Sequence, residues 1–180
     1  MEDDRRSYFR IDDMAWVLTA AWDPDQTSAV EYFPELRQAT TFQALDALDT
    51  EMAKVEKQMD NKPTAQYARL LNQKLDVFRQ ALLIQQLGQL DARPIRITIS
   101  EGGLGFTSDF AYTIGSHIAM ALVFSPSYMA IFPHAEVLDC RPVENGFYLH
   151  VTFVDMPESM RQQLARHLLT QQTQQRNQNK

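Results

Sequence analysis

The spacing of apolar residues changes twice along the chain, and each change predicts a different kind of element. Residues 14–22 (MAWVLTAAW) have the composition of a strand and end at an Asp-Pro-Asp turn, although periodicity alone does not exclude a helix. From Thr40 the apolar residues recur every three or four positions, which is typical of helices. From Arg93 they alternate with polar residues, which is typical of strands that bury one face.

Two helices are predicted between residues 40 and 91. The first carries a heptad seam made of Leu45, Leu48, Met52, Val55 and Met59. Residues 60–64 (DNKPT) end it, and Thr64 is a candidate N-cap for a second helix over about 65–90. That helix has two apolar stripes: Ala68, Leu71, Leu75, Phe78 and Leu82 in one, and Tyr67, Leu70, Val77, Ala81 and Ile84 in the other. A helix buried on one side needs one stripe, so the second predicts a further partner, either another subunit or the rest of the domain.

Six strands joined by short turns are predicted in the remainder, and they indicate a small antiparallel barrel. They cover residues 14–22, 94–100, 104–108, 117–124, 128–143 and 147–154, with turns at Glu101-Gly-Gly and Glu144-Asn-Gly where glycine supplies a positive φ. A last helix begins at about Asp155, and residues 170–180 are predicted to be a disordered tail. The expected fold class is α+β. A single domain, 1–180, holds a six-stranded antiparallel β-barrel, an inserted long helical hairpin at 40–91 and a C-terminal helix.

Composition narrows the possible functions. A net charge of −6 argues against bulk binding to nucleic acid or to an anionic membrane, both of which need a basic face. The longest apolar run, residues 118–124, is far short of the roughly 20 residues of a membrane span. With one cysteine, Cys140, and no signal-peptide pattern, we expect a cytoplasmic protein without disulfides.

No pattern of catalytic or metal-binding residues is found, so we expect neither an enzyme nor a metal or cofactor site. The four histidines are isolated from one another and from Cys140 in the sequence. There is no Gly-x-Ser-x-Gly motif. The glycines of residues 101–105 lack the following helix and the Lys-Ser/Thr pair of a phosphate-binding loop.

Three arginines, Arg5, Arg6 and Arg10, stand together before the first strand of this acidic chain. A guanidinium group can bind phosphate oxygens or a guanine edge bidentately, and its flat face stacks on purines. By itself the cluster could equally be a solvated charge run. A Ser-x-x-Gly turn from Ser100 to Gly103 is the candidate second half of an anion-binding site.

These two motifs together resemble those of the PilZ domain family. In that family an RxxxR motif precedes the first strand, and a (D/N)xSxxG motif lies in the turn between two later strands. Here the motifs are Arg6–Arg10 (RSYFR), doubled by Arg5, and Thr98–Gly103 (TISEGG). The resemblance covers about 5–22 and 93–170. The insertion resembles an atypical, tetramer-forming PilZ variant, in which two long heptad helices assemble a helical bundle.

The resemblance implies binding of cyclic di-GMP, a bacterial second messenger. Arg6 and Arg10 would contact guanine and phosphate with help from Arg5. Ser100 would hydrogen-bond the ligand, and Gly103 would provide the turn and a close approach of the backbone. Thr98 departs from the family pattern, because a hydroxyl has fewer acceptor sites than the family's carboxylate or amide.

Two functions are therefore expected from the sequence. The first is a cyclic di-GMP receptor that acts through an unidentified protein partner, in bacterial control of motility, pili, biofilm or virulence. The second is a non-enzymatic oligomeric scaffold with a degenerate site that does not bind the ligand. In both functions, residues 40–91 would join copies of the chain into a homo-oligomer, which is expected to be a tetramer or a dimer.

Overall fold

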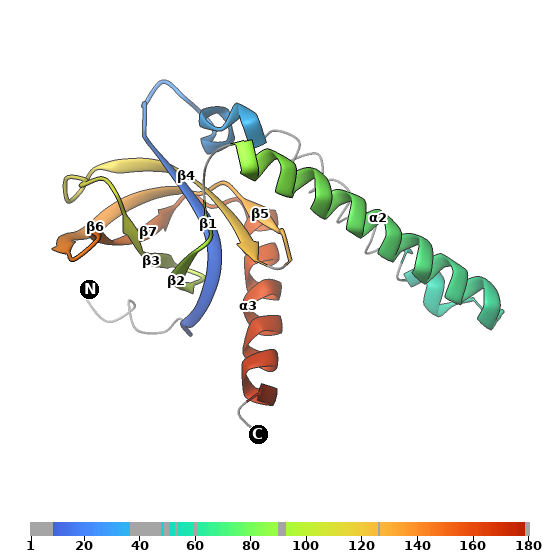
Figure 1. Ribbon diagram of the computed structural model, residues 1–180. Helices are drawn as coiled ribbons and strands as arrows, with labels where there is room; N and C mark the ends of the chain where they lie inside the picture. The colour runs from blue at the N-terminus through green and yellow to red at the C-terminus, as the bar shows by residue number, and fades with distance from the viewer. Residues whose placement is uncertain are drawn as a thin grey trace. The chain divides into compact units, whose positions relative to one another are not determined.

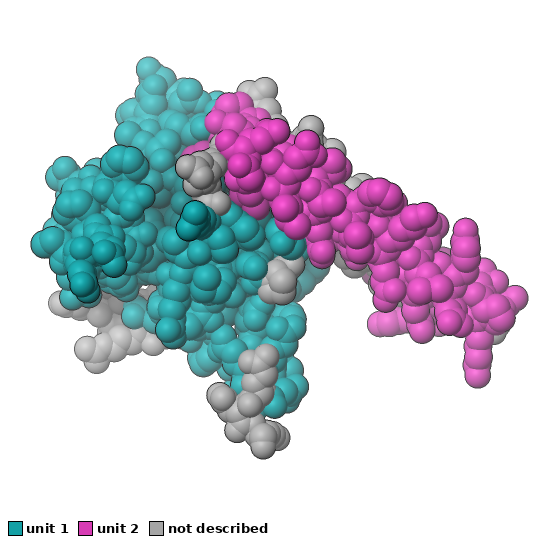
Figure 2. Space-filling view, viewed as in Figure 1, with its two compact units in different colours: residues 1–32, 93–180 teal, residues 33–92 magenta. Residues whose placement is uncertain are grey.

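The computed structural model describes residues 9–36, 48, 51–52, 54–59, 61–89, 93–125 and 127–178. The chain divides into two compact units, residues 1–32 with 93–180, and residues 33–92 (Figure 2). The first unit contains all the strands, and the second contains the long helix (Figure 1).

Six antiparallel strands of the first unit form a closed ring. In ring order they are β1 (Ile11–Ala21), β2 (Ile95–Ser100), β3 (Gly103–Ser108), β7 (Gly146–Val154), β6 (His134–Val143) and β4 (His117–Ser125). β1 closes the ring because its first residues, 11–15, pair with β2 and residues 14–21 pair with β4. The predicted α+β fold with six antiparallel strands is confirmed.

Two of the predicted strands differ from the structure by more than one residue. β1 begins at Ile11, three residues before the predicted start. The predicted strand over 128–143 is divided before His134 into the short β5 (Ala130–Ile131), which pairs with β4, and β6. Pro133 stands at the break because it has no N–H to donate to a strand ladder.

The ring is filled by its own side chains. Alternate residues of each strand point inward, and α3 (Glu158–Gln178) adds Leu164 and Leu168 to the same core. The inward residues are mainly branched and aromatic, and include Ile97, Ile99, Leu104, Phe106, Leu122, Phe124, Val137, Leu149 and Val151. The short η1 (Ala29–Tyr32) packs on β4, whose residues from Ile118 to Phe124 are buried on both faces.

The C-terminal helix is longer than predicted. α3 continues to Gln178, so the prediction of a disordered tail from residue 170 was wrong for residues 170–178. Tertiary contact explains the extension, since the side chain of Gln175 donates a hydrogen bond to the backbone carbonyl of Asp12 at 2.8 Å. A polar sequence alone does not report such a contact.

The second unit contains η2 (Pro34–Leu36), helical residues before Gln58, and α2 (Lys62–Gln89), on which η2 packs. α2 begins at Lys62, about three residues before the predicted start at residue 65. The Asn61 side chain accepts a hydrogen bond from the Thr64 N–H at 3.4 Å, so Asn61 is the N-cap. Pro63 falls in the first turn, where its missing N–H costs no helical bond.

Both predicted stripes of α2 are largely exposed to solvent in the single chain. Tyr67 is 69% exposed and Val77 is 63% exposed, and the other large members of both stripes exceed 40%. The buried residues of α2 are Ala65, Leu83 and Leu87, none of which belongs to a stripe. The described members of the heptad seam, Leu48, Met52, Val55 and Met59, are exposed as well, while Leu45 lies outside the described residues. Among the described helices, none is long and apolar enough to cross a membrane.

Candidate functional site

The register of three neighbouring strands brings four of the six predicted site residues to one end of the ring. Arg10 directly precedes Ile11, which pairs with Ile99 of β2. Thr98 pairs with β1, and Ser100 pairs with Gly103 of β3. The other two predicted residues, Arg5 and Arg6, lie outside the residues that the structure describes.

Strand alternation sets which of these side chains face outward. Ile97 and Ile99 are buried in the ring core, so Thr98 and Ser100 belong to the outer face of β2. Ser100 is nevertheless 8% exposed, and its hydroxyl donates to the Gly103 carbonyl at 3.4 Å. The Ser100 side chain is thus nearly enclosed at the β2–β3 turn.

Position 103 needs a glycine because there is no room for a Cβ atom, and not because its φ is positive. Among the described glycines, positive φ occurs at Gly115 and Gly146, so the prediction of a positive φ in the Glu101-Gly-Gly turn was wrong. A Cβ at Gly103 would instead collide with the backbone carbonyl oxygen of Val151 on β7. Glycine therefore lets two strands approach closely beside Ser100.

A carboxylate that the sequence analysis missed stands beside Thr98. Asp12 lies opposite Thr98 across the β1–β2 ladder. Arg96 Nη2 donates to Asp12 Oδ2 at 2.7 Å, and Thr98 Oγ1 donates to Asp12 Oδ1 at 3.0 Å. The hydrogen bond from Arg96, and next the one from Thr98, holds the pKa of the Asp12 carboxyl below its ordinary value. The sequence does carry a signal for Asp12, because residues two positions apart, such as Arg10 and Asp12, share one face of an extended segment. The signal was missed because the first strand was predicted to begin at residue 14, after Asp12.

An aromatic side chain borders this cluster on the adjoining strands. Gly105 of β3 lies opposite Thr98, and a Cβ there would collide with the Tyr148 hydroxyl. The Arg141 guanidinium carbon lies 5.0 Å from the centroid of the Tyr148 ring, a cation–π contact. The outer face of the strands therefore carries the Asp12 carboxylate and, beside it, the Tyr148 ring, which contacts a second arginine, Arg141.

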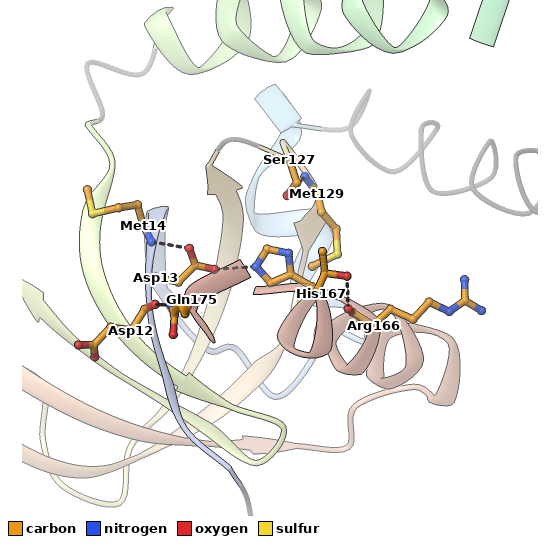
Figure 3. A network of polar contacts seen from close by, with 9 residues as sticks. Asp12, Asp13, Met14, Ser127, Met129, Arg166, His167 and Gln175 are labelled. Carbon is orange, nitrogen blue, oxygen red and sulfur yellow. Dashed lines mark hydrogen bonds and ion pairs between the residues drawn. The ribbon is translucent and has the colours of Figure 1, made fainter. Parts of the chain in front are cut away.

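The start of β1 is tied to α3 by a buried polar network (Figure 3). His167 Nε2 lies 2.6 Å from Asp13 Oδ2, and the two side chains are only 5% and 7% exposed. The other oxygen of Asp13 accepts from the Met14 N–H at 2.8 Å. Neighbouring strand residues point to opposite faces, so Asp13 faces α3 while the Asp12 carboxylate points away from His167, as Figure 3 shows.

Two histidines that are distant in sequence meet across β4 and β6. His117 Nδ1 lies 2.9 Å from His134 Nε2, and the His134 ring stacks on Trp22 with centroids 3.9 Å apart. Burial, and then the neighbouring His117, lowers the pKa of His134. Within the described part of the chain, no group of three or more His, Cys, Asp or Glu side chains is placed to hold a metal ion.

Comparison of the sequence with models of protein families shows the family of this chain. The model for the PilZ domain matches residues 64–170, more than half of the chain. The chain belongs to the PilZ domain family. The matched segment begins inside α2 and contains Thr98, Ser100 and Gly103, whereas β1 and the arginines before it lie outside the match.

Two solved structures share this PilZ fold. A pathogenic protein from Xanthomonas campestris, described as a new tetrameric PilZ domain self-assembled via an unusual helical bundle, has a TM-score of 0.59 and 17% identity over 94% of this chain and 91% of that one. YcgR from Escherichia coli, in complex with c-di-GMP, has a TM-score of 0.50 and 11% identity over 97% of this chain and 49% of that one. No curated protein sequence matches the chain.

Proposed function

We propose that this PilZ protein is a receptor for cyclic di-GMP, which binds on the outer face of β1, β2 and β3. The observation that carries the proposal is the strand register that gathers Arg10, Thr98, Ser100 and Gly103 at one end of these strands. The fold shared with the ligand-bound YcgR supports it.

The chemistry of the gathered residues suits a cyclic guanine dinucleotide. Because the chain has a net charge of −6, an anionic ligand needs local cations, and Arg5, Arg6 and Arg10 would supply them. Their forked donors match phosphate oxygens, and their planes can stack on guanine. Ser100 would add a hydrogen bond, and Gly103 would let the ligand approach the backbone. Contact of these arginines with the ligand would change the surface offered to a protein partner.

We propose further that residues 33–92 hold several copies of the receptor together. The exposed stripes of α2 and the exposed seam residues are far more apolar than a solvated helix requires. A tetrameric neighbour that assembles through a helical bundle supports this. Static light scattering on the full chain tests the assembly, and a monomeric mass across micromolar concentrations would contradict it. An oligomeric scaffold without a ligand is the alternative function that these faces favour.

Calorimetric titration with cyclic di-GMP tests the receptor proposal. We expect saturable binding by the full chain and a large loss of affinity in Arg10→Ala and in Ser100→Ala. Arg161→Ala is the matched control, since Arg161 is an arginine of α3 that contacts Glu158 at 3.9 Å and lies outside the site. Absence of heat at about 100 μM ligand would overturn the proposal and leave the scaffold.

A further inference from the structure

The outer face of the proposed site carries one carboxylate that is placed to recognise a base. Across the described strands β1, β2 and β3, the acidic residues are Asp12 and Asp13. Asp13 is buried against His167 of α3. Asp12 remains 53% exposed, two residues after Arg10 and directly opposite Thr98. A ligand on the outer face of these three strands would therefore meet the Asp12 carboxylate.

The hydrogen bonds of Asp12 leave it able to accept more. Each carboxylate oxygen receives one donor, Arg96 on Oδ2 and Thr98 on Oδ1. A carboxylate has about four lone-pair sites, so each oxygen keeps one for a ligand. The two donors also fix the plane of the carboxylate before a ligand arrives, which reduces the ordering cost of binding. By contrast, the Thr98 hydroxyl already donates its hydrogen bond to Asp12.

The chemistry of Asp12 selects a guanine edge over the other groups of a cyclic dinucleotide. Guanine presents an N1–H and an N2 amino group side by side, two donors that match two carboxylate oxygens. Adenine has an acceptor at N1, which a carboxylate repels. Phosphate is an anion and is repelled as well, so it would lie toward Arg10. An aspartate is ionised at neutral pH and is then a pure acceptor, and the pKa of the Asp12 carboxyl is lowered further by its donors.

We propose that Asp12 is the residue that determines base specificity in this protein, by accepting two hydrogen bonds from the Watson–Crick edge of a guanine base. The proposal rests on the proposed function, because it names the group with which that site distinguishes its ligand. Arg96 and Thr98 are positioning residues that act through Asp12.

Titration of the full chain with cyclic di-GMP and, separately, with cyclic di-AMP tests the proposal. For Asp12→Ala we expect an affinity for cyclic di-GMP that is about 10- to 100-fold lower, as for the loss of one bidentate base contact. The affinity for cyclic di-AMP should not fall, so the preference for guanine collapses. The control is Glu158→Ala, which removes an exposed carboxylate of α3, 3.9 Å from Arg161, and should leave both affinities unchanged.

A double variant, Asp12→Thr with Thr98→Asp, moves the carboxylate across the ladder while keeping the hydroxyl–carboxylate pair. We expect it to recover affinity and guanine preference relative to Asp12→Ala, and no recovery would contradict the proposal. Equal or tighter binding by Asp12→Ala would overturn it, as would an equal loss of affinity for both dinucleotides. Absence of binding by the unaltered chain is a different failure, because it overturns the proposed function itself. Thermal unfolding of each variant shows whether its fold is intact.

Discussion

The two units of this PilZ protein use their apolar residues in opposite ways. The strand ring turns them inward, and its core residues, such as Leu122, Leu149 and Val151, are fully buried. The helical unit leaves most of them outside, and Tyr67 and Val77 of α2 are more than 60% exposed. The core of the ring is thus filled within a single chain, whereas the described helices leave large apolar side chains exposed.

Because of this difference, apolar burial would stabilise the two units at different steps, namely folding of one chain and association of several. Burying a large apolar side chain contributes about 1.5–3 kcal/mol, and the ring gains that energy when one chain folds. Under the proposed assembly, the helices would gain it when copies associate, and their stability would depend on protein concentration. The two proposals thus assign ligand binding to the ring and assembly to the helices.

The largest effect is expected from removing the apolar face of α2. Replacing Leu71, Leu75, Phe78 and Leu82 by Gln should convert the oligomer to a monomer, because roughly 6 kcal/mol or more of burial is lost from each chain. Light scattering reports the mass, and near-UV circular dichroism reports the ring. Gln66→Ala with Gln73→Ala, at exposed polar positions of the same helix, is the control. An unchanged mass would mean that these residues do not hold the assembly.

The two units should also differ in what one polar pair contributes. His167→Ala removes the buried hydrogen-bond partner of the Asp13 side chain and should lower the free energy of unfolding by about 1–3 kcal/mol. Glu51→Ala removes an exposed partner of Lys54 in the helical unit and should change it by less than about 0.5 kcal/mol. Urea denaturation measures both. Similar values for the two variants would remove this distinction between the units.

Replacing one leucine by alanine in each unit tests the same difference in burial. Leu149→Ala should cost about 2–5 kcal/mol, because it opens a cavity in the ring core. Leu75→Ala removes a side chain that is 55% exposed and should cost less than about 1 kcal/mol in dilute solution, while weakening association. A large cost for Leu75→Ala at every protein concentration would show that α2 is buried within one chain.

The smallest effect is a pH dependence confined to the ring. The pKa of His134 is lowered from 6.5, chiefly by burial, so an unfolded chain binds a proton there at a pH at which the folded chain does not. Stability should therefore fall as the pH drops below 6.5 toward the lowered pKa. His134→Phe keeps a ring for Trp22 to stack on and should flatten that part of the profile. Thermal unfolding between pH 5 and 8 tests this, and a profile identical to that of the unaltered chain would contradict it.

Much of the ring could be predicted because its signals are local. Alternation over residues 94–100 and the turn at Asn145-Gly146 fix strands and a hairpin through neighbouring residues. The end of α3 could not be predicted in this way, since Gln175 is held by a contact with Asp12, 163 positions away. The same limit applies to Asp13 and His167, which form a pair only because α3 packs on β1.

The candidate site was predictable in its motifs but not in its arrangement. Ser100 and Gly103 were found from their spacing, yet the reason for Gly103 is the Val151 carbonyl of a strand that comes much later in the chain. Asp12 was missed because its importance depends on its register with Thr98. Register is set by the pairing of whole strands, so single-residue patterns do not reveal it.

Binding of cyclic di-GMP to the outer face of β1, β2 and β3 is what distinguishes the proposed receptor from a scaffold. Its most direct test is isothermal titration of that dinucleotide into the full-length chain at neutral pH, with Arg10→Ala measured in parallel. We expect saturable binding by the unaltered chain that Arg10→Ala abolishes or strongly weakens. No binding by the unaltered chain, or equal binding by both, would contradict it.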